Sequence, residues 1–385
     1  MAGENNCRAL VIIPLTGREC SEVLAQAQQV GRFVASGGLC DLVEWRLDLL
    51  SPVTEGLLAQ VSEVAAKVMA AAGVPLLATY RTEVEGGEGD PQLWEEFTVA
   101  ALGGGAQLVD VEVTHPQLPQ ALAAVAGASA IVLSKHQFTG NGEGVAAAVE
   151  ELRRGVDNLF DGPRHAGDTG TVIPSATEHM SQAQLREIAS KVVSKLAVMV
   201  QDASGFAAVQ DQLCRHPLPV THTVVGGQLE AVPATEWGVA RTDALASSQA
   251  SNGAENPRSS AHLPHAAVAT DAAADISLAG ANTAVSSCFD LPHARSVKLD
   301  LPDALAGGIM ITMGPAGKPG RTHPQTLGSC ATFAALAGQA SAPGQVDASE
   351  LTALDNETGC LSLNYVSTRA APRYLRGHPK AVGAN

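Results

Sequence analysis

Three charged residues alternate with apolar residues along one short run of the chain. Glu44, Arg46 and Asp48 are separated by Trp45 and Leu47. Because successive side chains of a β-strand point to opposite faces, the three charged groups share one face. In a closed parallel barrel that face lies near the C-terminal mouth, where the active sites of barrel enzymes are found. The spacing alone fits a catalytic or binding cluster and a structural ion pair at the barrel end equally well.

Polar residues occupy the same kind of position in three further runs that are predicted to be strands. They are Arg81 at the end of PLLATYR, Asp110 and Glu112 on one face of LVDVEV, and Ser134 and His136 on one face of AIVLSKH, with Lys135 pointing the opposite way. So many inward polar groups at strand ends favour an enzyme over a binding module.

A lysine interrupts the apolar run SKLAVMV at Lys195. Burying an ammonium group in an apolar strand is costly, so such a residue is uncommon as a structural element. Burial favours the neutral amine, which is the form that attacks a carbonyl carbon to give a Schiff base. Lys195 is therefore a candidate covalent nucleophile.

Two loops carry groups that could bind an anion. The Gly-rich segment 313–321 (MGPAGKPGR) resembles a P-loop only superficially, because Pro319 follows Lys318 where that motif requires Ser or Thr. The turn at 341–345 (SAPGQ) presents a hydroxyl and an amide. The remaining histidines lack the spacing of metal ligands, so no metal site is predicted.

These residues need a scaffold of parallel strands that end at one edge. Strands are predicted at 9–15, 41–47, 75–81, 108–113, 130–136, 194–200, 308–313 and 329–333, with helices at 21–34, 51–72, 91–102, 117–126 and 205–213. Alternating strands and helices indicate an α/β protein, and eight units predict a (β/α)8 TIM-type barrel. An open Rossmann-like sheet is disfavoured because no GxGxxG motif follows the first strand.

The barrel is predicted to span residues 1–354 as one domain with two low-complexity insertions. These lie at about 155–180 and 215–295, and residues 355–385 are expected to form an irregular C-terminal tail. The second insertion is rich in Ala, Ser, Asn and Pro, so it is expected to be disordered, with a second folded domain as the alternative. A helix at 205–213 should carry the chain away from the catalytic mouth before this insertion begins.

Composition limits the classes of partner that the protein can bind and indicates its cellular compartment. The formal net charge of −15 argues against non-specific binding to nucleic acid or to an anionic membrane. A small anionic substrate remains compatible, because a few arginines can hold a carboxylate inside an acidic protein. Seven cysteines without a pairing pattern, and no targeting or membrane-spanning segment, predict a cytoplasmic protein.

Eight motifs in this order resemble those of type I 3-dehydroquinate dehydratases. They are VEWRLD, TYRTEVEGGE, VDVEV, SKHQF, SKLAVMV, the Gly-rich loop that ends in Arg321, GSCATF and SAPGQ. The resemblance covers residues 9–140, 194–200 and 308–354. The residues of the VEWRLD and VDVEV motifs are most similar to those of the plant and algal branch of the family. A plastid location would follow if the chain came from a plant or an alga.

The resemblance implies a role for each matching residue. It implies that Lys195 forms a Schiff base with 3-dehydroquinate, that His136 is the general acid/base, and that Glu85 hydrogen-bonds this histidine. It assigns substrate and active-site contacts to the residues Glu44, Arg46, Arg81, Arg321, Ser341 and Gln345. The implied activity is dehydration to 3-dehydroshikimate in the shikimate pathway of aromatic amino-acid biosynthesis, without metal or organic cofactor. A homodimer is a possible assembly.

The sequence also departs from the family pattern. Gln137 follows His136 where the family usually has Asp or Asn, and Lys-Pro-Gly replaces the short apolar run before Arg321. The alternatives are therefore a catalytically impaired relative that acts as a binding protein, or another class I aldolase-type barrel that uses Lys195 on a different carbonyl compound.

Overall fold

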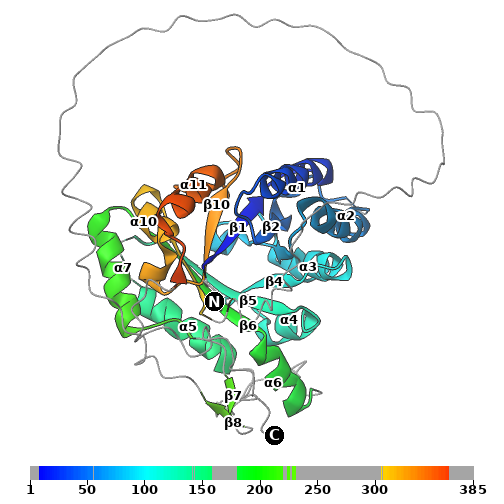
Figure 1. Cartoon of the computed structure of the whole chain (residues 1–385). Helices are drawn as coiled ribbons and strands as arrows, with labels where there is room; N and C mark the ends of the chain where they lie inside the picture. Colours follow the sequence, from blue (N-terminus) through cyan, green and yellow to red (C-terminus); the bar gives the residue numbers. More distant parts are fainter. Residues whose placement is uncertain are drawn as a thin grey trace, which may run out of the picture. The chain divides into compact units, whose positions relative to one another are not determined.

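The computed structural model describes residues 8–54, 56–140, 142, 144–157, 180–219, 223–225, 228–230, 305 and 307–363. Eight parallel strands form its centre (Figure 1). They are β1 (Leu10–Leu15), β2 (Leu42–Arg46), β3 (Leu76–Thr79), β4 (Leu108–Glu112), β5 (Ala130–Gln137), β6 (Val192–Met199), β9 (Ile309–Met313) and β10 (Ala331–Ala335). Their spatial order is β10-β1-β2-β3-β4-β5-β6-β9, and the two-residue β11 (Val346–Asp347) extends β10.

The two end strands of this sheet approach each other and close it into a barrel. The amide of Cys330, just before β10, donates a hydrogen bond of 3.0 Å to the carbonyl of Gly308, just before β9. The amide of Met310 donates to the hydroxyl of Ser329 at 2.8 Å. The predicted (β/α)8 barrel is therefore confirmed.

Helices surround the strands (Figure 1). They are α1 (Cys20–Ala35), α2 (Leu57–Ala72), α3 (Trp94–Gly103), α4 (Leu118–Ala124), α5 (Val145–Asp157), α6 (Gln182–Ser190), α7 (Ala203–Arg215), α10 (Lys318–Thr322) and α11 (Ala348–Thr358). In α1 the buried residues Val23, Ala27 and Val30 recur every three or four positions, so one apolar stripe faces the strands.

The core lies between the strands and the helices. Trp45 is fully buried in this apolar layer, whereas its neighbour Glu44 lines the cavity inside the barrel. The predicted alternation is confirmed for Glu44, Trp45 and Arg46, whereas β2 ends at Arg46 and Asp48 lies on the short 3₁₀ helix η1 (Leu47–Leu49). The same alternation on β4, β5 and β6 places Asp110, Ser134, His136 and Lys195 inside the barrel.

Several predicted boundaries are wrong. The second helix begins at Leu57 rather than near Ser51, because the amide of Ser51 donates to the carbonyl of Arg18 and joins two loops instead of opening a helix. Helix α5 continues to Asp157, two residues past the start expected for the first insertion at about 155. Four helices, α5, α6, α10 and α11, were not predicted at all.

The C-terminal boundary at residue 354 is also wrong. Helix α11 continues to Thr358, and Leu361 beyond it is buried. The carbonyl of Leu361 accepts a hydrogen bond of 2.8 Å from the amide of Ala9 at the start of β1. The folded chain therefore extends past the expected start of the tail, and residues 364–385 lie outside the described residues.

Most of the two predicted insertions also lies outside the described residues. Within the second, the structure describes the end of α7 and an antiparallel pair, β7 (Thr223–Val225) and β8 (Gln228–Glu230). No helix in the described part of the chain is both long enough and apolar enough to cross a membrane.

Candidate active site

A cavity of about 120 Å³ opens at the C-terminal ends of the barrel strands. Its lining includes all nine residues that the sequence analysis assigned to the site: Glu44, Arg46, Arg81, Glu85, His136, Lys195, Arg321, Ser341 and Gln345. They come from four barrel strands or their ends, β2, β3, β5 and β6, and from η2 (Glu83–Glu85), α10 and the loop before β11. The structure thus brings together residues that are up to 300 positions apart in the chain.

Lys195 lies deep in this cavity. Its register partner across the β5–β6 ladder is Ser134, so it sits one layer below His136, whose partner is Ala197. The side chain is 5% exposed, and Nζ lies 3.2 Å from Asp110 Oδ2 and 3.5 Å from Glu44 Oε1. Nζ also lies 4.8 Å from the centre of the Phe333 ring. Two carboxylates and an aromatic face therefore compensate the buried amine.

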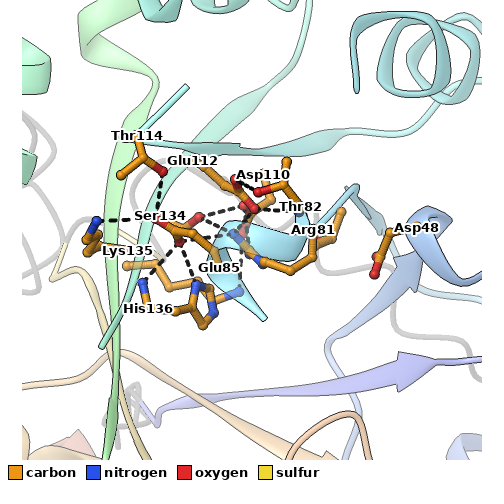
Figure 2. A network of polar contacts seen from close by, with 12 residues as sticks. Asp48, Arg81, Thr82, Glu85, Asp110, Glu112, Thr114, Ser134, Lys135 and His136 are labelled. Carbon is orange, nitrogen blue, oxygen red and sulfur yellow. Dashed lines mark hydrogen bonds and ion pairs between the residues drawn. The ribbon is translucent and has the colours of Figure 1, made fainter. Parts of the chain in front are cut away.

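Arg81, just after β3, holds the acidic residues of β4 in place (Figure 2). Its guanidinium donates to Asp110 at 2.9 Å, to Glu112 at 3.1 Å and to Ser134 at 2.9 Å. Burial opposes the charge on Arg81, but the carboxylates of Asp110 and Glu112 outweigh it and raise its pKa. The cation is therefore permanent, and these contacts fix the side chains around it.

His136 is oriented by a carboxylate. Its Nδ1 lies 3.0 Å from Glu85 Oε2, and its backbone amide donates to the same oxygen at 3.1 Å. Burial lowers the pKa of His136 well below its usual value of 6.5, and the nearby cations of Arg81 and Lys195 act in the same direction. The imidazole is thus neutral at neutral pH. With Glu85 ionised, Nδ1 donates its proton to the carboxylate and Nε2 is left free to accept one.

Glu85 closes the short 3₁₀ helix η2 (Glu83–Glu85) and is itself buried. Burial raises its pKa to about 7, and the carboxylate of Glu112 adds to this effect while Arg81 opposes it. The oxygen turned away from His136, Oε1, accepts a hydrogen bond of 2.8 Å from Thr114 and lies 3.6 Å from Lys135 Nζ. The group that orients the histidine therefore titrates close to neutral pH.

Donors without partners face the other side of the cavity. Arg321, on α10, donates from Nε to the carbonyl of Thr312 at 2.6 Å and from Nη2 to that of Pro343 at 2.9 Å. Its Nη1 and the Nε2 of Gln345 are buried and have no hydrogen-bond partner among the described residues. Burial lowers the pKa of Arg321 to about 10, still far above neutral pH. A buried cation with a free donor is suited to bind a carboxylate.

Two further predicted residues complete the lining. The side-chain oxygen of Gln345 accepts from the backbone amide of Ser341 at 2.8 Å, which fixes the turn. Arg46 forms a bidentate pair with Asp48, with distances of 2.9 and 2.7 Å. The ion-pair interpretation of this alternating run is therefore correct for Arg46 and Asp48, while Glu44 contacts Lys195.

Sequence reasoning missed other residues of the cavity. Thr79 donates to Glu44 at 2.9 Å, and its position two residues before Arg81 on the same strand face was a usable signal. Phe333 and Phe138 are apolar lining residues, and nothing in their spacing separates them from core residues. Thr114 does not line the cavity, but it donates to Glu85 at 2.8 Å because a loop brings Glu85 back over the strand ends.

Among the described residues, no group of three or more His, Cys, Asp or Glu side chains is placed to hold a metal ion.

Comparison with known proteins decides the family. The sequence model of the type I 3-dehydroquinase family matches residues 11–156 and 254–357, which is more than half of the chain. The chain belongs to the type I 3-dehydroquinase family.

Two curated relatives and one solved structure illustrate the relationship. The 3-dehydroquinate dehydratase of Enterococcus faecalis is 32% identical over 192 residues, which cover 46% of this chain and 71% of the relative. That of Klebsiella pneumoniae is 32% identical over 137 residues, which cover 34% of this chain and about half (51%) of the relative. The crystal structure of the Geobacillus kaustophilus 3-dehydroquinate dehydratase aligns over 92% of each chain with a TM-score of 0.52 and 17% identity, which shows a shared fold.

Lys195 lies outside both segments that match the type I 3-dehydroquinase model. Its assignment to the cavity of this family member therefore depends on the register of β6 against β5 and not on the match. These relatives are bacterial, so the expected affinity to the plant and algal branch stays a prediction.

Proposed function

We propose that this protein is a 3-dehydroquinate dehydratase, which removes water from 3-dehydroquinate through a Schiff base on Lys195. One observation carries the proposal. A buried lysine, a carboxylate-oriented histidine and a buried arginine with a free donor line one cavity at the mouth of a barrel of the matching family.

The reaction begins with the amine of Lys195. In its neutral form, Nζ attacks the C3 ketone, and loss of water from the adduct gives an iminium ion. The two carboxylates beside Nζ, Asp110 and Glu44, stabilise the positive charge that the iminium nitrogen keeps. The iminium withdraws electrons, so the proton on C2 becomes easier to remove.

His136 then transfers one proton from C2 to the leaving hydroxyl. Its free Nε2 removes the C2 proton, and the resulting enamine expels the C1 hydroxyl, which leaves as water when His136 returns the proton. Glu85 compensates the charge that the imidazolium carries between these steps. Hydrolysis of the iminium releases 3-dehydroshikimate and restores Lys195, so the net change is the loss of one water molecule.

Arg321 and Gln345 hold the substrate in place. Their free donors suit the C1 carboxylate, with Ser341 close enough to contribute a hydroxyl. Fixing this carboxylate on one side and C3 on Lys195 sets C2 between them, next to His136. The net negative charge of the protein does not oppose this, because the cavity carries its own cations.

Reductive trapping tests the proposal directly. Sodium borohydride added with 3-dehydroquinate should give an irreversible adduct on Lys195, located by peptide mass spectrometry, and Lys195→Ala should lose the adduct and turnover while keeping the circular dichroism of the wild type. Lys67→Ala is the matched control, since Lys67 pairs with Glu63 on the outer helix α2. An adduct only with other carbonyl compounds would point to a different aldolase-type barrel, and no adduct at all to a non-catalytic binding protein.

A further inference from the structure

The lysine between Ser134 and His136 is not used by the chemistry described above. Lys135 points away from the interior of the barrel, and its Nζ lies 3.3 Å from Glu151 on α5. The same ammonium group lies 3.6 Å from Glu85 Oε1, on the side of that carboxylate opposite to His136. Figure 2 shows Lys135, Thr114 and His136 converging on Glu85. One carboxylate thus connects an outer-face lysine to the histidine of the cavity.

We propose that Lys135 is a positioning residue, whose ammonium keeps Glu85 ionised and thereby keeps His136 in the form that accepts a proton. Its effect on turnover rests on the proposed dehydration, whereas its effect on the Glu85–His136 pair exists without substrate. Lys135 does not itself line the cavity and reaches it only through Glu85.

The two oxygens of the Glu85 carboxylate have different partners. Oε2 of Glu85 is engaged by the ring and the backbone amide of His136, so Oε1 must be compensated separately. Thr114 supplies a neutral hydrogen bond to Oε1, and Lys135 supplies a positive charge. The Lys135 side chain is 17% exposed and that of Glu85 is 1% exposed, so water screens this pair only in part.

The other charges around Glu85 act on its pKa in opposite directions. Arg81, after β3, lies 3.6 Å from Oε2 and favours the ionised form, but it is already shared with Asp110 and Glu112. Glu112, on β4, and burial both favour the protonated form. Lys135 is thus a second cation beside Glu85. The first, Arg81, also forms ion pairs with Asp110 and Glu112.

The remaining charges that face His136 come from its other neighbours. Arg46 on β2, Lys195 on β6 and Arg81 after β3 all lower the pKa of the imidazole together with Lys135, and burial is the largest cause. Removing Lys135 should therefore raise the pKa of Glu85 and that of His136 together. Both increases in pKa disfavour the state in which Glu85 is ionised and His136 is neutral.

Titration of His136 by NMR, without substrate, is the deciding experiment. The ring protons report the joint titration of the Glu85–His136 pair, and His136→Asn identifies their signal among the 11 histidines. In Lys135→Met the midpoint should rise by about 0.5 to 1 pH unit, as expected for the loss of one partly screened charge. Lys135→Arg should restore the wild-type midpoint, and Lys67→Met, which removes a lysine from α2, should not change it.

A second variant changes the pair in the other direction without touching Lys135. Glu151 is 36% exposed and competes with Glu85 for the ammonium, so Glu151→Gln should lower the midpoint relative to the wild type. An unchanged midpoint in Lys135→Met, or an unchanged or raised one in Glu151→Gln, overturns the proposal. If Lys135→Met does not fold, a lowered midpoint in Glu151→Gln supports the proposal and an unchanged one counts against it.

Turnover separates this inference from the proposed function. If the protein dehydrates 3-dehydroquinate, the acid limb of its kcat/KM profile should move upward in Lys135→Met by the same amount as the NMR midpoint. A purely structural lysine would lower the rate at every pH and leave the limb in place. A shifted midpoint in a protein without dehydratase activity would keep the positioning role and refute the proposed function.

Discussion

Asp110 accepts hydrogen bonds from three side chains at once. Its Oδ1 binds Arg81 at 2.9 Å and Ser134 at 2.6 Å, and its Oδ2 binds Lys195 at 3.2 Å. Burial opposes its ionisation, but Arg81 and Lys195 outweigh burial and lower its pKa. A fixed anion at this point lets two cations coexist in a space that excludes most water.

At this scale the alternation of strand residues made much of the site predictable. Asp110, Ser134 and His136 could be assigned to the interior because side-chain direction in a strand is a local property. The contact between Glu85 and Lys135 could not, because it depends on how a loop returns to the end of another strand. The free donor of Arg321 is equally invisible, since it reflects which carbonyls the other nitrogens reach.

Replacing His136 by Ala should separate covalent chemistry from proton transfer. Lys195 is held by Asp110 and Glu44 and not by the histidine, so the borohydride adduct should still form. Turnover should fall by about 10²- to 10⁴-fold, the usual range for loss of a general acid/base. Mass spectrometry and a steady-state assay on the same sample check both. Loss of the adduct along with activity would instead indicate that His136 holds the site together.

Replacing Glu85 by Gln should reduce activity and yet stabilise the fold at alkaline pH. The pKa of Glu85 rises from an ordinary 4.5 to about 7 on folding, so the native state binds more protons than the unfolded state between these values. Its contribution to the free energy of unfolding is thus favourable at low pH and is lost as the pH rises from 4.5 to 7. Urea unfolding at pH 8 should show a gain of about 1–3 kcal/mol in Glu85→Gln. The opposite sign at pH 8 would mean that its hydrogen bonds outweigh the cost of burying its charge.

The secondary structure was predictable where a local pattern determines it. The eight strands begin and end within about two residues of their predicted positions, because their apolar runs are buried on both sides. The start of α2 was not predictable, since it depends on the hydrogen bond from Ser51 to Arg18 in another loop. Helix α6 was missed although Ser181 and Gln184 form a capping box, a signal that the sequence carries openly.

Helices α1 and α2 depend on a glycine at their crossing. A Cβ placed on Gly31 would lie 2.1 Å from the carbonyl oxygen of Ala71, which belongs to the backbone and cannot rotate away. Gly31→Ala should therefore push the helices apart and lower the free energy of unfolding by about 1–3 kcal/mol. Gly103 at the end of α3 is the matched control, because a Cβ there would meet only Ser62 Oγ at 3.9 Å. Equal stabilities of the two alanine variants in urea unfolding would contradict this account of the packing.

The barrel can be considered apart from the long segment between α7 and β9. Leu218, shortly after α7, lies next to Gly308, shortly before β9, because a Cβ on Gly308 would be 3.3 Å from Leu218 Cδ1. The two ends of the intervening chain are thus close together, and a short loop can join them at little entropic cost.

Replacing residues 231–300 by a short Gly/Ser linker should therefore give a folded protein. Circular dichroism should match the wild type after correction for length, and borohydride trapping should still label Lys195. Turnover should change little, since the residues described as lining the cavity all lie outside this range. A variant that folds but no longer binds the substrate carboxylate would mean that the removed segment contributes to the site.

The closure of the barrel has a consequence for synthesis on the ribosome. Strand β1 pairs with β2 on one side and with β10 on the other. The register partner of Ile12 in β10 is Phe333, which is synthesised about 320 residues later. At roughly 5–20 residues per second, translation leaves this edge of β1 without its partner for about 15 to 60 s. An apolar strand with an unpaired edge is a template for aggregation. Nascent chains that stop before β10 should therefore be the species that chaperones hold and that aggregate when chaperones are scarce.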